Sequence, residues 1–432
     1  MSKLLILDHG LFTSFAQRLA KDFDVMYFAP YADRSFPTHE PAMVGSGLEG
    51  VERVPSFWSA LASMDIEKDT VMLPDVGFWD LAVYLRSVGW SVWGAGDGEK
   101  LEIQRWRAKE TMKALGLPVN KCQLVTGMTA LRDYLADNDN VYVKISGFRG
   151  LAETFEVKTL DLARTRLDEL EYHLGGAREV FPFVVEHRVD SIVEAGYDGF
   201  CIDGNFPSTC LTGVEVKDRG YLGAVRDYDK LSEPVRVVND RLAPFLAEAR
   251  YRQFFSTEIR VTDKGVPYLI DLTTRGPLPP SELYHEMIPN LGEIIYWGAR
   301  GQIVEPKWAC KYGALAIIKS DLSNNNWSEV SVSPEAKRWV KWRNYAEIEG
   351  QGYILPITKG IGMIECGAVI GLGNSVEEAI RACQKNAEGV EGFDVKIHAE
   401  ALPEALDEIQ KGEDNDIIFT DENLPDKKDL MD

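Results

Sequence analysis

The chain has 432 residues, enough for two or three domains, and 45% hydrophobic with 10% aromatic residues supply packed cores. A formal net charge of −21 argues against an extended basic surface for nucleic acid or an anionic membrane. There is no apolar run of about 18 residues, and the start, MSKLLILDHG, indicates a strand rather than a signal peptide. The six cysteines are scattered without a CxxC pair, as in a reducing compartment. We therefore expect a cytoplasmic protein without nucleic-acid or membrane partners.

Short apolar strands alternate with helical patterns in the first 98 residues. Strands are predicted at 3–8, 24–30, 70–75 and 91–94, with helices ending near 21 and 88. This alternation predicts a parallel sheet with helices on its faces, and hence a small α/β domain. His9 and Gly10 end the first strand, where ligands are often held, although a plain turn explains a single glycine as well.

The rest of the chain mixes helices with hairpins. Further elements are expected as a helix at 99–115, strands at 141–145, 183–189, 312–319 and 353–369, a hairpin at 254–262 and 266–273, and a helix at 375–386. We divide the sequence into 1–98, 99–300 (a small lobe in 99–185, a hinge and hairpin in 186–300), 301–411 and 412–432. The last segment has eight acidic and two basic residues, which predicts a flexible, solvated tail.

Several common catalytic motifs are absent from the sequence. GxxxxGK[ST], GxSxG and HExxH do not occur, and the six histidines are far apart. Nucleophilic hydrolysis and zinc chemistry therefore have little support.

Two lysines occupy positions that suit an anion. Lys109 lies in a helix, and Lys144 lies inside the apolar strand VYVKI, where burial is costly unless an anion pairs with it. The turn that follows is Ser146-Gly147-Phe148-Arg149-Gly150, whose backbone N–H groups and Arg149 guanidinium suit phosphate oxygens. Taken alone, a strand lysine is more often a snorkelling edge residue.

A carboxylate ends the apolar strand FPFVVE at Glu186. His187, Arg188 and Val189 follow, and Glu194 lies eight residues after Glu186. Free backbone groups in such a linker suit the edge of adenine, and a later carboxylate suits the two ribose hydroxyls. A solvated strand end is the plainer interpretation.

The hairpin carries the most specific pattern. Glu258 and Asp271 lie on its two strands, and Thr273 and Arg275 alternate with Asp271 on one face. Two carboxylates that converge repel unless a cation lies between them, and magnesium binds few protein carboxylates together with phosphate oxygens. Arg275 suits a transferred phosphoryl group. A surface hairpin with cross-strand charges is the alternative.

The order of these pieces resembles the ATP-grasp superfamily, in particular phosphoribosylamine–glycine ligase and related carboxylate–amine ligases. The matching phrases are Leu101-Glu102, Ala108-Lys109, Gly116-Leu117-Pro118, Lys144, Val185–Val189, Glu258 and Asp271–Arg275. Asp271 and Thr273 stand where the family has Glu and Asn, which predicts looser binding of a second metal ion.

The resemblance implies an α/β and α+β architecture: an N-terminal parallel α/β domain, a two-lobed ATP-grasp module and a C-terminal α+β domain. It implies ATP and Mg²⁺ or Mn²⁺ as cofactors and a small-molecule carboxylate and amine as substrates, while a homodimer is left open. The implied residues are Lys144, Lys217 and Arg275 for catalysis, Lys109, Lys144, Ser146, Gly147, Arg149, Gly150, Glu186, His187, Val189, Glu194 and Lys217 for the nucleotide, and Glu258, Asp271 and Thr273 for the metal.

The expected reaction is amide formation through an acylphosphate. A phosphotransferase on the same fold, a nucleotide-binding protein without catalysis, and an α/β protein without a nucleotide are the alternatives. The substrate pocket is expected among His9, Gly10, Asp75, the hairpin and residues 276–286.

Overall fold

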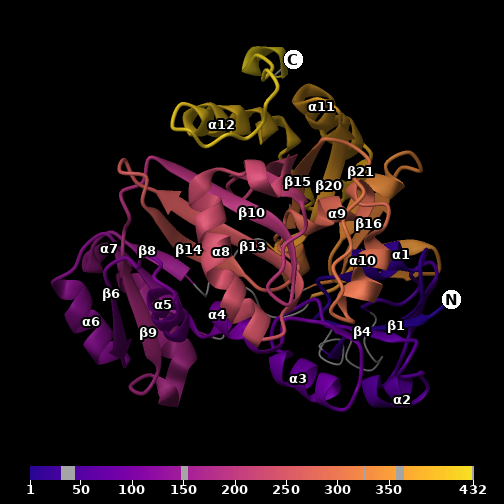
Figure 1. The fold of residues 1–432 in the computed structure, drawn as a ribbon, viewed down its shortest axis with the longest axis horizontal. Helices are drawn as coiled ribbons and strands as arrows, with labels where there is room; N and C mark the ends of the chain where they lie inside the picture. Colours follow the sequence, from indigo (N-terminus) through magenta and orange to yellow (C-terminus); the bar gives the residue numbers. More distant parts are fainter. Residues whose placement is uncertain (31–43, 147–153, 325, 357–363, 431–432) are drawn as a thin grey trace.

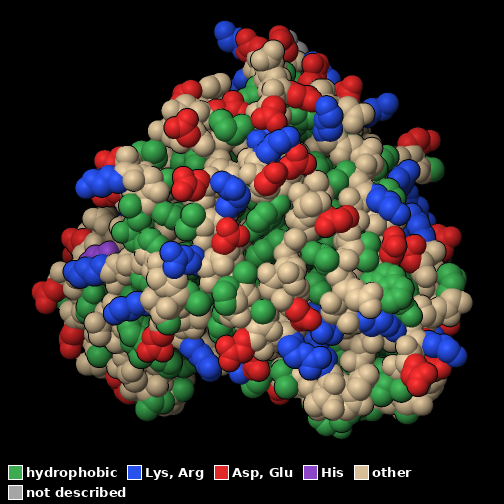
Figure 2. Space-filling model, in the orientation of Figure 1, with side chains coloured by type: hydrophobic (Ala, Val, Ile, Leu, Met, Phe, Trp, Pro, Cys, Tyr) green, Lys and Arg blue, Asp and Glu red, His purple; other side chains and the backbone are tan. Residues whose placement is uncertain are grey.

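The computed structural model describes residues 1–30, 44–146, 154–324, 326–356 and 364–430. Figure 1 shows the N-terminal sheet at the lower right, a small lobe at the left and a long sheet through the centre. Acidic and basic side chains are interspersed over this face of the molecule (Figure 2). None of the helices in the described part of the chain is long and apolar enough to cross a membrane.

The N-terminal domain is a parallel sheet in the order β3-β2-β1-β4-β5. Its central strand reads KLLIL, and Leu4, Leu5 and Ile6 are fully buried, as expected for a parallel strand covered on both faces. The expected strands are confirmed, and β3 and α2 were not predicted. The elements are β1 Lys3–Leu7, α1 Thr13–Leu19, β2 Asp24–Phe28, β3 Val51–Arg53, α2 Phe57–Ala62, β4 Thr70–Met72, α3 Trp79–Ser87 and β5 Val92–Trp93.

The small lobe is an antiparallel sheet in the order β6-β9-β7-β8. Helices α6 and α7 bury Leu131, Leu135 and Leu167 against the strand residues Val143 and Phe183 in a core of their own. The elements of this part are α4 Lys100–Ile103, α5 Arg105–Ala114, β6 Cys122–Thr126, α6 Met128–Ala136, β7 Val141–Ile145, β8 Thr154–Val157, α7 Leu160–Leu174 and β9 Pro182–His187.

One large sheet runs in the order β14-β13-β10-β11-β12-β15-β20-β17, and β22 pairs with β15. Because β12 pairs with β15, the sheet crosses the expected boundary at residue 300. The segment that we expected as a domain at 301–411 therefore shares this sheet with strands of the segment expected at 99–300. The elements are β10 Val193–Ile202, β11 Thr209–Val216, β12 Gly220–Asp227, α8 Glu233–Glu248, β13 Arg252–Val261, β14 Pro267–Thr273, β15 Tyr312–Ser320, β17 Val340–Trp342, β20 Ile364–Gly373, α11 Val376–Ala387 and β22 Lys396–Ile397.

A second small sheet, β18-β19-β16-β21, and three helices complete the described fold. A continuous core joins Leu4 and Phe12 of the first domain to Leu315 and Ile370 of the long sheet. The remaining elements are α9 Ser281–Met287, α10 Leu291–Gly298, β16 Ser328–Val332, β18 Tyr345–Ile348, β19 Gln351–Ile354, β21 Val390–Gly392 and α12 Ala405–Glu413.

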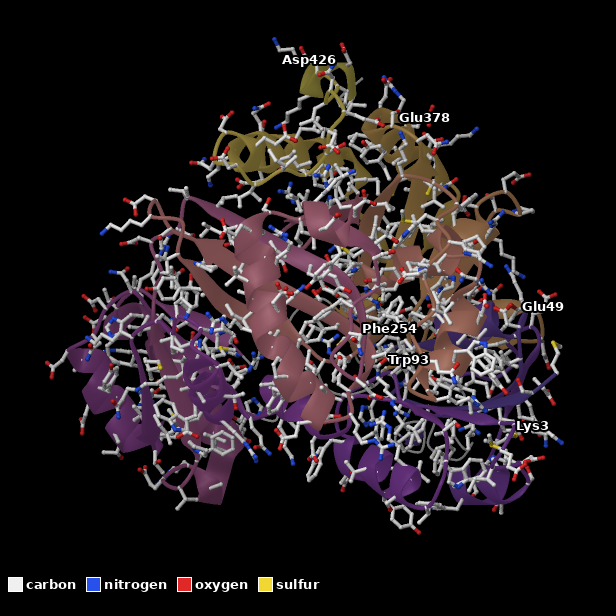
Figure 3. All side chains as sticks on the ribbon, viewed as in Figure 1. Lys3, Glu49, Trp93, Phe254, Glu378 and Asp426 are labelled. Atoms are coloured by element: carbon white, nitrogen blue, oxygen red, sulfur yellow. The ribbon has the colours of Figure 1, made fainter. Side chains whose placement is uncertain are left out.

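The N-terminal domain is fixed to the long sheet by backbone and aromatic contacts. Trp93 of β5 meets Phe254 of β13 edge to face, with ring centroids 5.1 Å apart, at the centre of Figure 3. Next to Trp93, the Gly94 N–H donates to the carbonyl oxygen of Arg252 at 2.7 Å. The strand ends of the first domain are thereby held beside the hairpin.

The C-terminal segment folds against the long sheet. Phe419 and Leu430 are only 4% and 1% exposed, and Arg226 Nη1 lies 2.9 Å from Asp421 Oδ2. The segment that we expected as a flexible, solvated tail is therefore anchored at Phe419 and Leu430, while many of its other residues are exposed. The sequence suggested a solvated tail because acidic residues outnumber the two apolar residues that anchor the segment.

Candidate active site

The β13–β14 hairpin brings the two predicted carboxylates together. The predicted hairpin is confirmed, and within it Glu258 pairs directly with Asp271, with a register shift after Glu258. Glu258, Asp271, Thr273 and Arg275 line one cavity of about 730 Å³. Glu194 and Lys217 line the same cavity from β10 and from the turn after β11.

Four carboxylates, Glu194, Glu215, Glu258 and Asp271, form what we call the carboxylate cluster of the cavity wall. Burial, together with the negative charges of Glu194, Asp271 and Glu215, raises the pKa of Glu258 to about 7. Arg260 offsets part of this, since its Nη2 lies 2.6 Å from Glu194 Oε1.

This donor set fits magnesium, which favours carboxylate oxygens and keeps several waters or phosphate oxygens. Among the described residues, no group of three or more His, Cys, Asp or Glu side chains encloses a metal site by itself. Glu258, Asp271 and Thr273 would hold the ion, with phosphate oxygens completing its shell.

Asp271 also contacts a cation that the sequence did not single out. Arg105 Nη1 lies 2.7 Å from Asp271 Oδ1. Burial alone would raise the pKa of Asp271, but the positive charges of Arg105 and Lys144 outweigh it and lower the value to about 2. The Arg105 N–H also donates to Ser146 Oγ at 3.2 Å. A signal for Arg105 existed, because it lies one helical turn before Lys109 on α5.

A second cluster, the lysine cluster, surrounds Glu186 in the small lobe. Lys109 Nζ lies 3.1 Å from Glu186 Oε2, and Lys144 Nζ lies 3.8 Å from Glu186 Oε1. Burial would raise the pKa of Glu186, but the charges of Lys144 and Lys109 lower it overall. Lys144 is 5% exposed, which excludes the snorkelling interpretation. Its protein anion is Glu186, whereas the sequence suggested only phosphate.

The lysine cluster abuts the hairpin. Lys144 Nζ donates to the carbonyl oxygen of Ile270 at 2.8 Å, one residue before Asp271. Lys144 and Asp271 therefore lie close together, although they are 127 positions apart in the sequence. Within the described residues, Lys109, Lys144, Ser146, Glu186, His187 and Val189 belong to this neighbouring region rather than to the cavity wall. Gly147, Arg149 and Gly150 lie outside the described residues.

The hinge backbone is already engaged at His187. Its N–H donates to the Lys121 carbonyl at 2.8 Å, and its carbonyl accepts from Asn120 Nδ2 at 3.0 Å. The expected free groups for an adenine edge are therefore not at His187. Val189 is buried, and the intervening Arg188 lines the cavity.

Arg275 is aimed by Glu102, whose part in the site the sequence did not reveal. Arg275 Nε lies 3.0 Å from Glu102 Oε1, and Glu102 Oε2 accepts from the Thr274 backbone N–H at 2.7 Å. Because Glu102 is buried at the start of α4, it holds the end of the hairpin in place.

The C-terminal segment supplies an unexpected wall of the cavity. Glu404, Asp407, Glu408 and Lys411 line it from the region of α12, above the long sheet in Figure 1. Arg219 Nη1 and Nη2 lie 2.7 and 2.5 Å from the two oxygens of Glu404, a bidentate ion pair that joins this segment to the sheet. No local pattern in the sequence connects residues so far apart.

Comparison with solved structures identifies the architecture. Phosphoribosylamine–glycine ligase from Thermotoga maritima superposes with a TM-score of 0.66 at 16% identity, covering 91% of this chain and 98% of that one. The chain has the ATP-grasp fold. No family model and no curated protein sequence matches it.

Two further ATP-grasp structures show the same likeness. L-amino acid ligase from Bacillus licheniformis has a TM-score of 0.58 at 15% identity, with 92% of this chain and 99% of that chain covered. The biotin carboxylase domain of a Hydrogenobacter thermophilus 2-oxoglutarate carboxylase has a TM-score of 0.60 at 13% identity, covering 100% and 98%. That domain was solved as a dimer with the magnesium salt of ADP, with ADP and with bicarbonate.

Proposed function

We propose that the chain is an ATP- and magnesium-dependent ligase that joins a small-molecule carboxylate to an amine through an acylphosphate. The observation that carries the proposal is the hydrogen bond from Lys144 Nζ to Ile270 O, because it sets the lysine cluster beside the hairpin whose Glu258 and Asp271 line the cavity. A triphosphate with a divalent cation matches both. The six cysteines are free thiols, in keeping with the cytoplasmic setting that we propose.

In the proposed first step, the substrate carboxylate attacks the γ-phosphate of ATP and ADP departs. Lys144 and Lys109 neutralise phosphate charge, Arg275 is held by Glu102 toward the transferred group, and Lys217 contributes a further positive charge in the same cavity. Magnesium, when bound, would supply positive charge that stabilises the negative charge of the phosphates. Glu258, Asp271 and Thr273 provide its protein oxygens.

In the proposed second step, an amine attacks the acyl carbon and inorganic phosphate leaves. The walls of the cavity come from β10, β11, β13, β14 and the region of α12, which limits access of water to the acylphosphate. The protein's contribution in both steps is positioning and electrostatic stabilisation.

The test is a screen of the twenty amino acids and common dicarboxylates with ATP, magnesium and hydroxylamine. We expect acid-dependent ADP release with one hydroxamate formed for each ADP, because hydroxylamine traps an acylphosphate. Amide products with amines from the same panel would be identified by mass spectrometry. ADP release without hydroxamate would indicate a phosphotransferase, and ATP binding without ADP release would indicate a protein that only binds the nucleotide.

A further inference from the structure

A buried aspartate lies in the cavity beside the residues proposed to hold magnesium. Asp198 pairs with Ser256, and Ser256 pairs with Thr273, so these three residues form one row across β10, β13 and β14. Glu258 and Asp271 stand in the next row, two residues away along their strands and therefore about 7 Å away on the same face of the sheet. The five side chains all line the cavity.

The polar face of the sheet ends at this row. The following row on the same face is the pair Phe200 and Phe254, which belong to the apolar core that α9 shares with the sheet. Asp198, which is 6% exposed, is therefore the last polar position before that core and forms part of the cavity floor. The sequence placed the substrate pocket partly in the first domain, but this cavity is not lined by His9, Gly10 or Asp75.

Two hydroxyl groups hold the Asp198 carboxylate in place. Tyr221 Oη donates to Asp198 Oδ2 at 2.6 Å, and Ser256 Oγ donates to Oδ1 at 2.6 Å. The Tyr221 side chain reaches across β11 because Gly213 leaves room for it, since a Cβ at Gly213 would overlap the tyrosine hydroxyl. An ionised carboxylate has about four lone-pair sites, so both oxygens can accept from a further donor.

The Asp198 carboxylate has no counter-ion from the protein. Within the described residues, no lysine, arginine or histidine forms an ion pair with it. Burial raises the pKa of Asp198 to about 6, and the hydrogen bonds from Ser256 and Tyr221 offset part of the rise, so the group is negatively charged at neutral pH. A buried charge without a partner is costly, and a cationic ligand in the cavity would remove that cost.

We propose that Asp198, together with Tyr221 and Ser256, is the subsite for an ammonium group of the substrates. A primary ammonium ion has three N–H donors, which suit the remaining lone pairs of the carboxylate and of the two hydroxyl oxygens. Its positive charge compensates that of Asp198, one row of residues from the proposed metal site. The ligand is an amine, or an amino acid that enters as the acid. The inference deepens the proposed function and rests on it.

The test removes the charge of the subsite and keeps its shape. Asp198→Asn has the same size as the original side chain and can form hydrogen bonds with both hydroxyl groups. It also removes the cost of ionising a buried carboxyl group, so without substrate its Tm at neutral pH should equal or exceed that of the original protein. Asp198→Ser serves as a second neutral substitution at the same position.

Asp8 offers a matched control in the first domain. It is 0% exposed, its Oδ1 accepts from Tyr27 Oη at 3.0 Å, and burial raises its pKa to about 6, as for Asp198. Unlike Asp198, it also accepts from backbone N–H groups, and it does not line the cavity. Asp8→Asn should therefore leave the KM of both substrates unchanged. Asp240→Asn is a second control, at a surface aspartate that accepts from Tyr228 Oη at 3.1 Å.

Each variant is given the acid–amine pair with the highest ADP release in the screen, and separately the same acid with hydroxylamine, which is uncharged at neutral pH. We expect both Asp198 variants to raise the KM of the substrate that carries the ammonium group by about 10- to 100-fold, because a charge-assisted contact is lost. A higher KM for the amine, with hydroxamate formation changed by less than about threefold, would identify the amine as the occupant. A higher KM for the acid in both reactions would identify an amino acid.

The outcomes separate the two proposals. KM values for both substrates within about threefold of the original in both Asp198 variants would overturn the subsite while leaving the ligase intact. A lower kcat in both reactions with unchanged KM values would also overturn it, because Asp198 would then act only through the fold. Absence of hydroxamate with every acid in the unmodified protein would overturn the ligase proposal, and the subsite with it.

Discussion

The lysine cluster and the carboxylate cluster shift the pKa of a buried glutamate in opposite directions. Glu186 and Glu258 both lose water contact, yet the pKa of Glu186 falls and that of Glu258 rises to about 7. Neighbours explain the difference, since Lys109 and Lys144 face Glu186 whereas Glu194 and Glu215 approach Glu258. One region has spare positive charge and the other spare negative charge. A ligand with both signs, such as a phosphate chain with a divalent cation, satisfies the two together.

The largest expected effect on activity comes from removing a positive charge of the lysine cluster. Lys144→Met should reduce acid-dependent ADP release by about 100- to 1,000-fold, because one donor to developing phosphate charge is lost. The matched control is Lys341→Met, a lysine that is 6% exposed and paired with Glu286, in β17 at the far end of the strand order from β14. Both variants should lose thermal stability, and only the first should lose turnover. Turnover within tenfold of the original in Lys144→Met would contradict the phosphate role.

An intermediate effect is expected on the negative side from Glu258→Gln. The pKa of Glu258 is raised from 4.5 to about 7 in the folded protein, so folding favours the protonated acid. The free energy of unfolding should therefore fall as pH rises from about 4.5 to about 7 and stay low above that. Glu258→Gln removes the cost of ionising a buried carboxyl group. Without magnesium at pH 8, the variant should therefore be more stable than the original by on the order of 1–3 kcal/mol, which raises its Tm by a few degrees.

At pH 4.5 the two melting temperatures should converge, and magnesium should stabilise the original protein more than the variant. Thermal melting with and without magnesium measures both effects. Glu408→Gln is the control, because Glu408 also lines the cavity but is exposed beside Lys411. The Tm of Glu258→Gln minus that of the original protein should be larger at pH 8 than at pH 4.5. The opposite order would contradict the predicted pH dependence.

The smallest effect is expected from changing one neutral oxygen. Thr273→Asn should lower the magnesium concentration for half-maximal ADP release by roughly 3- to 10-fold, because an amide oxygen binds hard cations better than a hydroxyl does. Titration of magnesium at saturating ATP measures it, with Thr126→Asn, a substitution of an exposed residue at the end of β6, as the control. An unchanged or higher requirement would place Thr273 outside the metal site.

Local patterns were enough to predict the parallel sheet and the hairpin. Strand alternation about the DKG turn placed Glu258 and Asp271 on the two strands of one hairpin, where they pair directly. The apolar strand VYVKI singled out Lys144, whose burial the structure then decided. Arg105 and Glu102 were missed because their partners, Asp271 and Arg275, lie more than 160 residues away in the chain. Such pairs become visible only when the hairpin folds over α4 and α5.

The extent of the long sheet and the C-terminal wall could not be predicted for the same reason. β12 pairs with β15 although α8 and the hairpin lie between them in the sequence. The sequence of a strand does not by itself identify the strand with which it pairs. The acidic residues after Gly412 suggested a solvated tail, and many of them are exposed, but the buried side chains of Phe419 and Leu430 anchor the segment. A few apolar anchors outweighed the average composition.

The pairing of β12 with β15 also bears on how the chain can be divided. In a fragment ending at residue 300, β12 would be an exposed edge strand. The backbone N–H and C=O groups of Gly220–Ala224, which now pair with β15, would then be available to other molecules. Exposed edge strands pair with one another, so copies of the fragment are expected to associate. Expression of residues 1–300 alone should therefore give insoluble material, and any shortened version has to retain β15 and β20.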